Sequence, residues 1–399
     1  MKVFIIHAQA GAGHKSAALA IKDAFDKANT GHDVRVIDSL EYANRLFRST
    51  YIWGYNFMVS KAPFLWTFSF YFTDFKPLRP FIRTVRRMMN FINGHKLYSF
   101  IRKERPDCIV ATHFLATDII SNLKMSKLYD GKLITCVTDY GVHDFWISSQ
   151  VDIYVAAAEY TKNELISKGI QADRIRVLGI PVQEKFTKKL ERGEAAAKLG
   201  LKEGLFTVLI IGGGLGVGPI PEMVETIAGT SEPFQLIVVC GNNEGLLKEI
   251  EDIAKRSKIS IKPFGFVNNV NELMDASDVM ISKPGGLSIS EAMVKGLPVI
   301  VNTYIPGQEE SNLMFLEKNG VGVGVKTVGE TLEKLEGLYR SKETLDAMRA
   351  KAKQLGKPSS AGDIVLLVLG TLEKMVNTRK ELTSSAVNTR KELTISDDK

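Results

Sequence analysis

The chain has 399 residues, a hydrophobic fraction of 45%, a formal charge of +7 and a pI near 9.0. This length allows two domains of ordinary size, each with its own core. No stretch reaches the roughly 18 consecutive apolar residues that a membrane-spanning helix needs, and the start of the chain carries no signal-cleavage pattern, so we expect a cytoplasmic location. The basic charge favours an anionic partner: a nucleotide, a nucleic acid or an acidic membrane.

The first strand is expected at residues 2–8 and leads into a glycine loop, Gly11-Ala12-Gly13-His14. A phosphate-binding Walker loop would need glycines at Gln9 and His14, so that interpretation fails. A dinucleotide-binding loop fits better, because Ser16 follows the two glycines and Asp38 ends the second strand. A glycine pattern this short is a weak signal, however, and by itself does not decide the function.

Aromatic and basic residues crowd together between residues 51 and 107, where only Asp74 and Glu104 oppose the lysines and arginines. Apolar residues repeat there at helical spacing. Helices packing into the N-terminal core would explain part of this composition. An interfacial element, with aromatic rings among lipid headgroups and arginines on acidic lipid, explains both features, and no nucleic-acid module is recognisable.

We therefore expect an anionic membrane surface, and no nucleic acid, as a partner of this segment. The residues predicted to face the acceptor or the membrane are Gly11, Gly13, Trp53, Trp66, Phe70, Phe72, Arg83, Arg86 and Arg87.

Strand and helix signals alternate through the rest of the chain, which predicts parallel sheets with helices on both faces. One series ends near Gly179-Ile180-Pro181-Val182, and a second begins at the strand 206–211. The sequence therefore predicts an α/β protein with two doubly wound, Rossmann-like domains facing across a cleft, at residues 1–180 and 181–375. A polar octamer repeats within residues 376–399, which we expect to be a disordered tail.

The segment 278–312 reads as strand, glycine turn, helix, strand and polar loop. The turn Lys283-Pro284-Gly285-Gly286 precedes a helix in which Ser288 and Glu291 have capping-box spacing, and Gly296 lies where a helix ends. Free N–H groups at such a helix start are a natural site for a diphosphate. A glycine turn used only for geometry is the simpler reading of this segment taken alone.

These motifs together resemble glycosyltransferases of the GT-B type, most closely the family of monogalactosyl- and glucosyl-diacylglycerol synthases. The resemblance runs from Lys2 to about Val376 and rests on the first glycine loop, residues 138–143, residues 179–182, and the later glycine and GQEE motifs. It implies transfer of a hexose from a UDP-sugar to diacylglycerol, with inversion at the sugar carbon. It also implies a protein bound peripherally to the inner face of the cell membrane. No metal and no cofactor besides the nucleotide sugar are expected.

By this resemblance the C-terminal domain holds the donor: the glycine turn faces the diphosphate, Glu291 holds the ribose hydroxyls, and Gln308 and Glu309 hold the sugar. The full set of predicted donor residues is Gly212, Gly213, Gly214, Gly216, Phe266, Val267, Lys283, Gly285, Gly286, Ser288, Glu291, Gln308 and Glu309.

The reaction needs a base for the acceptor proton, and the sequence offers His14 and Asp139, both expected at strand ends. Asp139 is either the alternative base or the carboxylate that orients the imidazole. Two other functions stay open. The first is a GT-B enzyme with a soluble acceptor, or an epimerase, and the second is a nicotinamide-dependent dehydrogenase using Gly11, Gly13 and Asp38.

Overall fold

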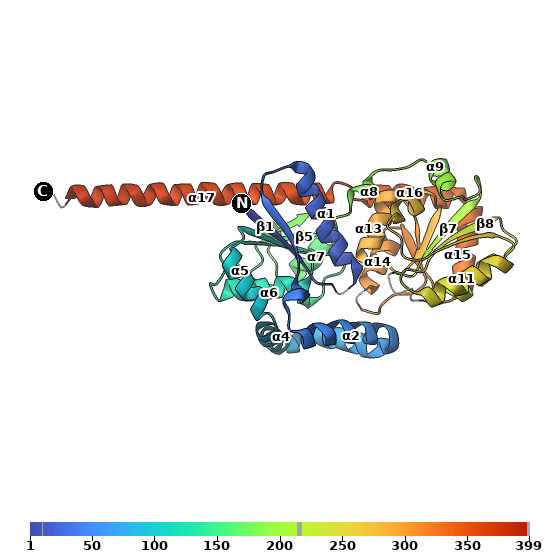
Figure 1. Cartoon of the computed structure of the whole chain (residues 1–399), viewed down its shortest axis with the longest axis horizontal. Helices are drawn as coiled ribbons and strands as arrows, with labels where there is room; N and C mark the ends of the chain where they lie inside the picture. Colours follow the sequence, from blue (N-terminus) through green and yellow to red (C-terminus); the bar gives the residue numbers. More distant parts are fainter. Residues whose placement is uncertain (10, 214–217, 308, 397–399) are drawn as a thin grey trace.

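The computed structural model describes residues 1–9, 11–213, 218–307 and 309–396. It contains two lobes, each built on a six-stranded parallel sheet covered by helices on both faces (Figure 1). The predicted α/β architecture of two doubly wound domains is therefore confirmed.

The N-terminal sheet has the strand order β2-β1-β3-β4-β5-β6. Its four central strands are nearly continuous runs of apolar residues, as expected for parallel strands buried on both faces, whereas the edge strands β2 and β6 are partly exposed. The order reverses between β1 and β3, so their carboxyl ends flank a topological switch point. The elements of this lobe are β1 (Lys2–His7), α1 (Ala12–Ala28), β2 (Asp33–Asp38), α5 (His95–Glu104), β3 (Cys108–Ala111), α6 (Phe114–Met125), β4 (Lys132–Cys136), β5 (Ile153–Ala156), α7 (Glu159–Ser167) and β6 (Ile175–Val177).

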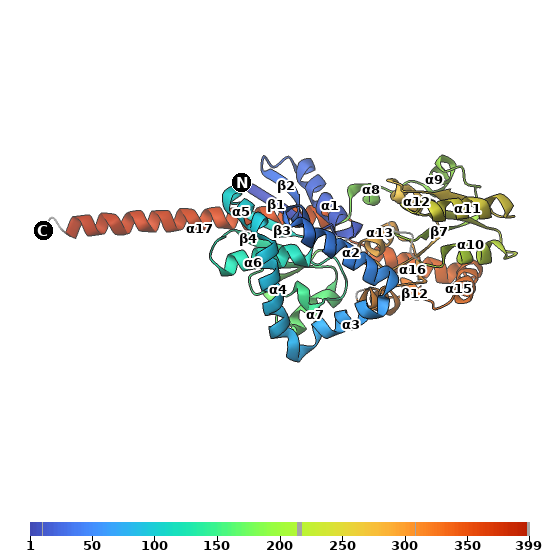
Figure 2. The ribbon, with the colours of Figure 1, turned by 60° about the horizontal axis from the view of Figure 1, so that its bottom comes forward.

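Three further helices are inserted between β2 and α5. They are α2 (Arg45–Lys61), α3 (Pro63–Asp74) and α4 (Arg79–Asn93). Figure 2 shows α2 and α3 extending from the N-terminal lobe toward the C-terminal lobe, and α4 lying along the N-terminal lobe. This is the aromatic and basic segment of the sequence.

The C-terminal sheet has the order β12-β11-β10-β7-β8-β9, and its switch point lies between β7 and β10. Its elements are α8 (Glu184–Thr187), α9 (Arg192–Lys198), β7 (Phe206–Ile211), α10 (Ile220–Ala228), β8 (Phe234–Val239), α11 (Glu244–Arg256), β9 (Ser260–Phe264), α12 (Val270–Asp275), β10 (Val279–Ser282), α13 (Gly286–Lys295), β11 (Val299–Val301), α14 (Glu310–Lys318), β12 (Gly322–Gly324), α15 (Val328–Arg340) and α16 (Lys342–Leu355).

The last helix, α17 (Ser360–Ser396), returns to the N-terminal lobe and projects beyond it (Figure 1). Its apolar residues Ile364, Val365, Val368 and Leu372 are buried in the same core cluster as Val3 of β1. Their spacing puts them on one helical stripe, which explains why this helix leaves the donor lobe. Two expectations therefore need correction: residues 360–375 pack with the N-terminal lobe, and the backbone after residue 376 is helical to Ser396, not disordered.

Candidate active site

Several of the predicted site residues of both lobes lie just beyond the carboxyl ends of the four switch-point strands. In the N-terminal lobe, β1 leads to the loop before His14, and β3 leads to Thr112 and His113. In the C-terminal lobe, β7 leads to Gly212 and β10 leads to Lys283. These strand ends are the positions where open parallel sheets bind ligands.

The two lobes touch directly at this site, and the absence of a side chain at Gly286 makes the contact possible. A Cβ atom at Gly286 would collide with the Thr138 carbonyl oxygen, and one at Gly13 would lie 3.6 Å from the Leu287 Cβ. Gly11, the residue before α1, has a φ of 94°, a backbone conformation that residues with a side chain rarely adopt. The first glycine loop and the start of α13 therefore face each other across the lobe boundary.

His14 lies in the first turn of α1, and its ring is held by two threonines. Its Nδ1 atom lies 2.9 Å from the carbonyl oxygen of Thr112 and 2.8 Å from the hydroxyl of Thr138. A carbonyl oxygen only accepts hydrogen bonds, so Nδ1 carries the proton and Nε2 keeps a free lone pair. Among the described residues, Nε2 has no hydrogen-bond partner.

Burial is the main cause of the low pKa of His14. It lowers the pKa of the imidazole to about 4, and a positive charge on His7 would lower it further, while the Thr112 carbonyl opposes the shift. The ring of His113 packs edge-on against it at 4.4 Å between centroids. At neutral pH the His14 ring is therefore uncharged, which is the state that a base needs.

Asp139 does not orient His14, contrary to one of the predicted roles. The described contacts of its carboxylate lead to the other lobe, where its Oδ1 atom accepts a hydrogen bond from Asn312 Nδ2 at 3.2 Å. Asn312 is fully buried, donates to the Pro284 carbonyl oxygen as well, and accepts from the backbone N–H of Tyr140 at 2.7 Å. Thr112 and Thr138 hold the His14 ring in place of the carboxylate.

Burial raises the pKa of Asp139 to about 6, with a smaller contribution in the same direction from Glu309; the Asn312 hydrogen bond and Lys283 oppose the shift. The residue therefore changes its charge near physiological pH, and in the sequence it directly follows Thr138, whose hydroxyl bonds His14. The geometry keeps Asp139 as a candidate for moving a proton.

On the donor side, Lys283 lies beside the Gly212–Gly213 loop and the polar loop after β11. Its Nζ atom is 2.9 Å from Glu309 Oε1, and a Cβ atom at Gly213 would lie 3.1 Å from Lys283 Cε. Glu309 is buried, and its other oxygen accepts the Ile305 N–H at 2.9 Å. An ammonium group is thus held next to two loops expected to contact the nucleotide sugar.

The helix α13 begins at Gly286, with Gly285 as its N-cap, and no side chain caps its first N–H groups. The capping-box prediction for Ser288 is therefore wrong, because this residue already lies inside the first turn. Gly296 ends the helix with a φ of 70°, as predicted. The uncapped helix start remains available to an anion.

Glu291 lies on α13, and 9% of its surface is exposed. Burial raises the pKa of its carboxyl group to about 8, and Lys185 opposes the shift only in part. No hydrogen bond of its side chain occurs among the described residues. A buried carboxyl group without such a partner is typical of a binding site that is completed by a ligand.

The structure describes only some of the other predicted donor residues. Phe266 is 64% exposed and Val267 is partly buried, both after β9. Gly214, Gly216 and Gln308, three of the predicted donor residues, lie outside the described residues. Asp38, the ribose-binding acid of the dehydrogenase alternative, is buried. Its Oδ1 atom accepts from the Leu40 N–H at 3.0 Å and from the Gln9 N–H at 3.3 Å, so its described hydrogen bonds are to its own turn and to the loop after β1.

The inserted helices expose much of their aromatic and apolar surface. Among the predicted membrane residues, Trp53 is 65% exposed and Phe72 is 47% exposed. The other exposed apolar side chains on α2, α3 and α4 and the turn between α3 and α4 are Phe57, Phe64, Leu65, Phe68, Tyr71, Phe75, Phe81, Met88, Met89 and Ile92. We call these side chains, together with Trp53 and Phe72, the aromatic surface. Exposure of so many large apolar side chains within one inserted segment marks an interaction site.

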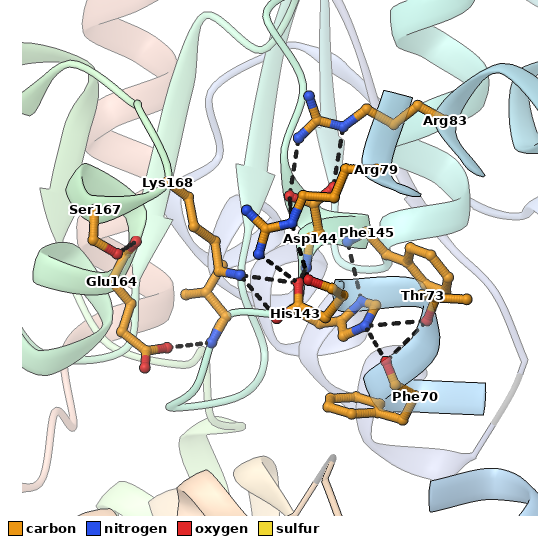
Figure 3. Close-up of polar contacts among 12 residues, drawn as sticks. Phe70, Thr73, Arg79, Arg83, His143, Asp144, Phe145, Glu164, Ser167 and Lys168 are labelled. Carbon is orange, nitrogen blue, oxygen red and sulfur yellow. Dashed lines mark hydrogen bonds and ion pairs between the residues drawn. The ribbon is translucent and has the colours of Figure 1, made fainter. Parts of the chain in front are cut away.

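Four of the residues predicted to meet the membrane or acceptor have a different placement. Arg83 forms two hydrogen bonds to Asp144 at 2.9 and 3.0 Å (Figure 3), and Arg86 pairs with Asp118 at 3.0 Å. Trp66 and Phe70 are only partly exposed. Arginine side chains that pair with buried carboxylates secure α4 to the lobe, so of the three predicted arginines only Arg87 is exposed.

No helix in the described part of the chain is long and apolar enough to cross a bilayer.

The two parallel sheets with facing switch points define the protein as one of the GT-B fold. MurG of Acinetobacter baumannii superposes with a TM-score of 0.60 at 14% identity, over 92% of this chain and 99% of that one. HepE of Anabaena, solved with UDP-glucose, has a TM-score of 0.55 at 14% identity, over 93% and 100%. The UDP-GlcNAc 2-epimerase of Neisseria meningitidis reaches 0.59 at 16%, over 93% and 100%. At these identities the likeness shows the fold alone.

Sequence comparison is more specific. The family model for monogalactosyldiacylglycerol (MGDG) synthase matches residues 14–182, and that for the glycosyltransferase family 28 C-terminal domain matches residues 207–364. A processive diacylglycerol beta-glucosyltransferase of Bacillus mycoides (strain KBAB4) is 28% identical over 371 residues, which span 92% of this chain and 93% of the relative. Its namesake from Bacillus cereus (strain B4264) matches to the same extent. The N-terminal lobe therefore matches the monogalactosyldiacylglycerol synthase family and the C-terminal lobe the glycosyltransferase family 28 C-terminal domain, and the whole chain is similar to processive diacylglycerol glucosyltransferases.

Proposed function

We propose that the protein transfers a hexose from a UDP-sugar to the hydroxyl of diacylglycerol at an anionic membrane surface, with inversion at the sugar carbon. The names of its relatives support the diacylglycerol acceptor, and a nucleotide complex of a GT-B neighbour supports the donor. The observation that carries the proposal is the aromatic surface, which lies on helices next to the junction of the two lobes (Figure 2). A lipid acceptor is the substrate that such an enzyme would collect there.

In the proposed reaction, the diacylglycerol hydroxyl oxygen attacks the anomeric carbon as its bond to the diphosphate breaks. The hydroxyl proton passes to Nε2 of His14, and UDP leaves with the bonding electrons. Lys283 and the uncapped N–H groups of α13 stabilise the charge that develops on the diphosphate. The Thr112 carbonyl keeps the Nδ1 proton in place, so that Nε2 is the accepting atom.

The donor nucleotide is proposed to occupy the C-terminal lobe, with its ribose at Glu291 and its hexose beside Glu309. The proposal requires no cofactor besides the nucleotide sugar. We further propose that the enzyme binds peripherally to the cytoplasmic face of the membrane, where UDP-sugars and anionic lipid meet.

Mass spectrometry of lipids tests this function. Purified protein is incubated with vesicles of diacylglycerol and phosphatidylglycerol and, in turn, with UDP-glucose, UDP-galactose, UDP-glucuronic acid and UDP-GlcNAc. We expect one of these sugars to yield glycosylated diacylglycerol, with the β configuration visible by NMR if the donor is α-linked. Release of a 2-epimer from UDP-GlcNAc, with no lipid product from any donor, would instead establish an epimerase.

Membrane attachment is tested by placing charge on the aromatic surface. The double substitution Phe64→Glu and Phe68→Glu should reduce sedimentation with anionic vesicles by at least about tenfold, because carboxylates would have to enter an acidic headgroup layer. Both side chains are about two-thirds exposed, at 71% and 67%, so the fold should survive. The matched control is Leu366→Glu on α17, also 67% exposed. Equal vesicle binding by all three proteins would contradict membrane attachment through this surface.

A further inference from the structure

The helix α3 presents two different faces. Phe64, Phe68 and Phe72 follow one another at intervals of four residues and are all exposed, and the rings of Phe68 and Phe72 stack at 5.7 Å. Phe70 points elsewhere and is only partly exposed. The same short helix therefore belongs both to the aromatic surface and to a contact inside the protein.

That inner contact is with the polar loop of the opposite lobe. Gly307 has a φ of 82°, and a Cβ atom there would lie 2.5 Å from Cδ1 of Phe70, so the ring sits directly on the loop backbone. The neighbouring side chain, Tyr71, donates its hydroxyl to Glu310 Oε2 at 2.5 Å. Two adjacent residues of α3 thus hold residues 307 and 310 from outside.

The loop they hold is part of the donor side. Glu309 lies between the two contacted positions, and its carboxylate pairs with Lys283 and accepts the Ile305 N–H. A shift of Gly307 or Glu310 would move Glu309 and, through it, the Lys283 ammonium group. Side chains outside the nucleotide site therefore set the geometry of a charged pair within it.

The carboxyl end of α3 is fixed to the N-terminal lobe (Figure 3). His143 Nε2 lies 3.1 Å from the Phe70 carbonyl oxygen, and Asp74 accepts from Lys168 at 3.1 Å and from Arg79 at 3.2 Å. With one end anchored and the adjacent residues seated on the opposite lobe, α3 is a rigid link between the two lobes. Its exposed face is the one that would enter lipid.

We propose that α3 couples membrane binding to donor binding, with Phe70 and Tyr71 as positioning residues that hold Gly307 and Glu310, and with them Glu309, in the arrangement that accepts the nucleotide sugar. The inference rests on the proposed function for its lipid surface and its UDP-sugar donor. Seating of the aromatic surface in a bilayer fixes α3, and α3 fixes the loop. By thermodynamic reciprocity, bound donor should then also strengthen membrane binding.

The test measures UDP binding by calorimetry, first without lipid and then with phosphatidylglycerol vesicles. Phe70→Ala removes the ring from Gly307, and Tyr71→Phe removes only the hydroxyl that bonds Glu310. Phe68→Ala, on the outward face of the same helix, is the matched variant. Circular dichroism and thermal unfolding of each variant report whether the fold is retained.

For the unmodified protein we expect vesicles to tighten UDP binding about fivefold or more. Phe70→Ala and Tyr71→Phe should weaken lipid-free UDP binding by about tenfold and reduce the effect of vesicles, with vesicle binding retained. Phe68→Ala should weaken vesicle binding and leave lipid-free UDP binding unchanged. Combining Tyr71→Phe with Glu310→Ala should cost no more than either substitution alone, because both break the same hydrogen bond.

Two results would overturn the inference alone: unchanged UDP binding by Phe70→Ala and Tyr71→Phe, or no effect of vesicles on UDP binding by an unmodified protein that still makes glycolipid. A folded, unmodified protein that binds no UDP would instead overturn the proposed function, and the inference with it.

Discussion

Replacement of His14 by alanine is expected to lower kcat for hexosyl transfer by about 10²- to 10⁴-fold, the usual contribution of a positioned general base. The expectation rests on Nε2, which keeps its lone pair because the Thr112 carbonyl oxygen holds the proton on Nδ1. The affinity for UDP should stay within about twofold, because the described contacts of His14 are all within the N-terminal lobe. Single-turnover measurements on diacylglycerol vesicles would check both values.

Asp139 provides the competing assignment, and pH separates the two. The pKa of His14 is lowered to about 4 and that of Asp139 is raised to about 6. Each group acts as a base only in its deprotonated form, so kcat/KM should fall below about pH 4 if His14 is the base and below about pH 6 if Asp139 is. Asp139 would be the general base if kcat/KM of the unmodified protein fell below about pH 6, if this fall were absent in Asp139→Asn, and if His14→Ala remained active.

The sheets could be predicted from the sequence because each parallel strand is a short apolar run that ends at a glycine or polar residue. This pattern placed Gly212, Lys283 and the first glycine loop at strand ends, and the topology then brings them to two switch points. The threonines that hold His14 were missed. Thr112 and Thr138 also follow strands, and that position was the one signal that could have identified them.

The helical spacing of apolar residues in α4 separated an apolar face from a basic one, but it did not show which face packs against the N-terminal lobe. The arginines were expected to face lipid, yet Arg83 and Arg86 pair with Asp144 and Asp118, which lie far away in the sequence. Tertiary pairing of this kind leaves no local pattern. The same holds for Asn312, whose three contacts join residues from both lobes only after the chain has folded.

Substitution of Glu291 by glutamine should weaken UDP binding by about 1.5–3 kcal/mol, roughly tenfold to a hundredfold in Kd, the range for a hydrogen bond to a charged group. The same substitution should raise the melting temperature of the free protein at pH 8. Burial raises the pKa of this carboxyl from 4.5 to about 8, so between these pH values it ionises in the unfolded chain but stays protonated in the folded one, and stability falls progressively as pH rises. Glutamine removes that loss of stability, and calorimetry and thermal unfolding measure the two effects.

The pH dependence of UDP binding gives the decisive comparison. If the ribose hydroxyls donate to an ionised Glu291, binding favours the deprotonated form, and Kd should fall by about tenfold between pH 7 and pH 9 as the free carboxyl passes its pKa. UDP itself is fully ionised above about pH 7, since the second pKa of a phosphate is near 6, so its own titration contributes little. In Glu291→Gln this slope should vanish. A side chain that only supported α13 would instead lower the melting temperature on replacement and leave the slope unchanged, and that result would remove Glu291 from the ribose site.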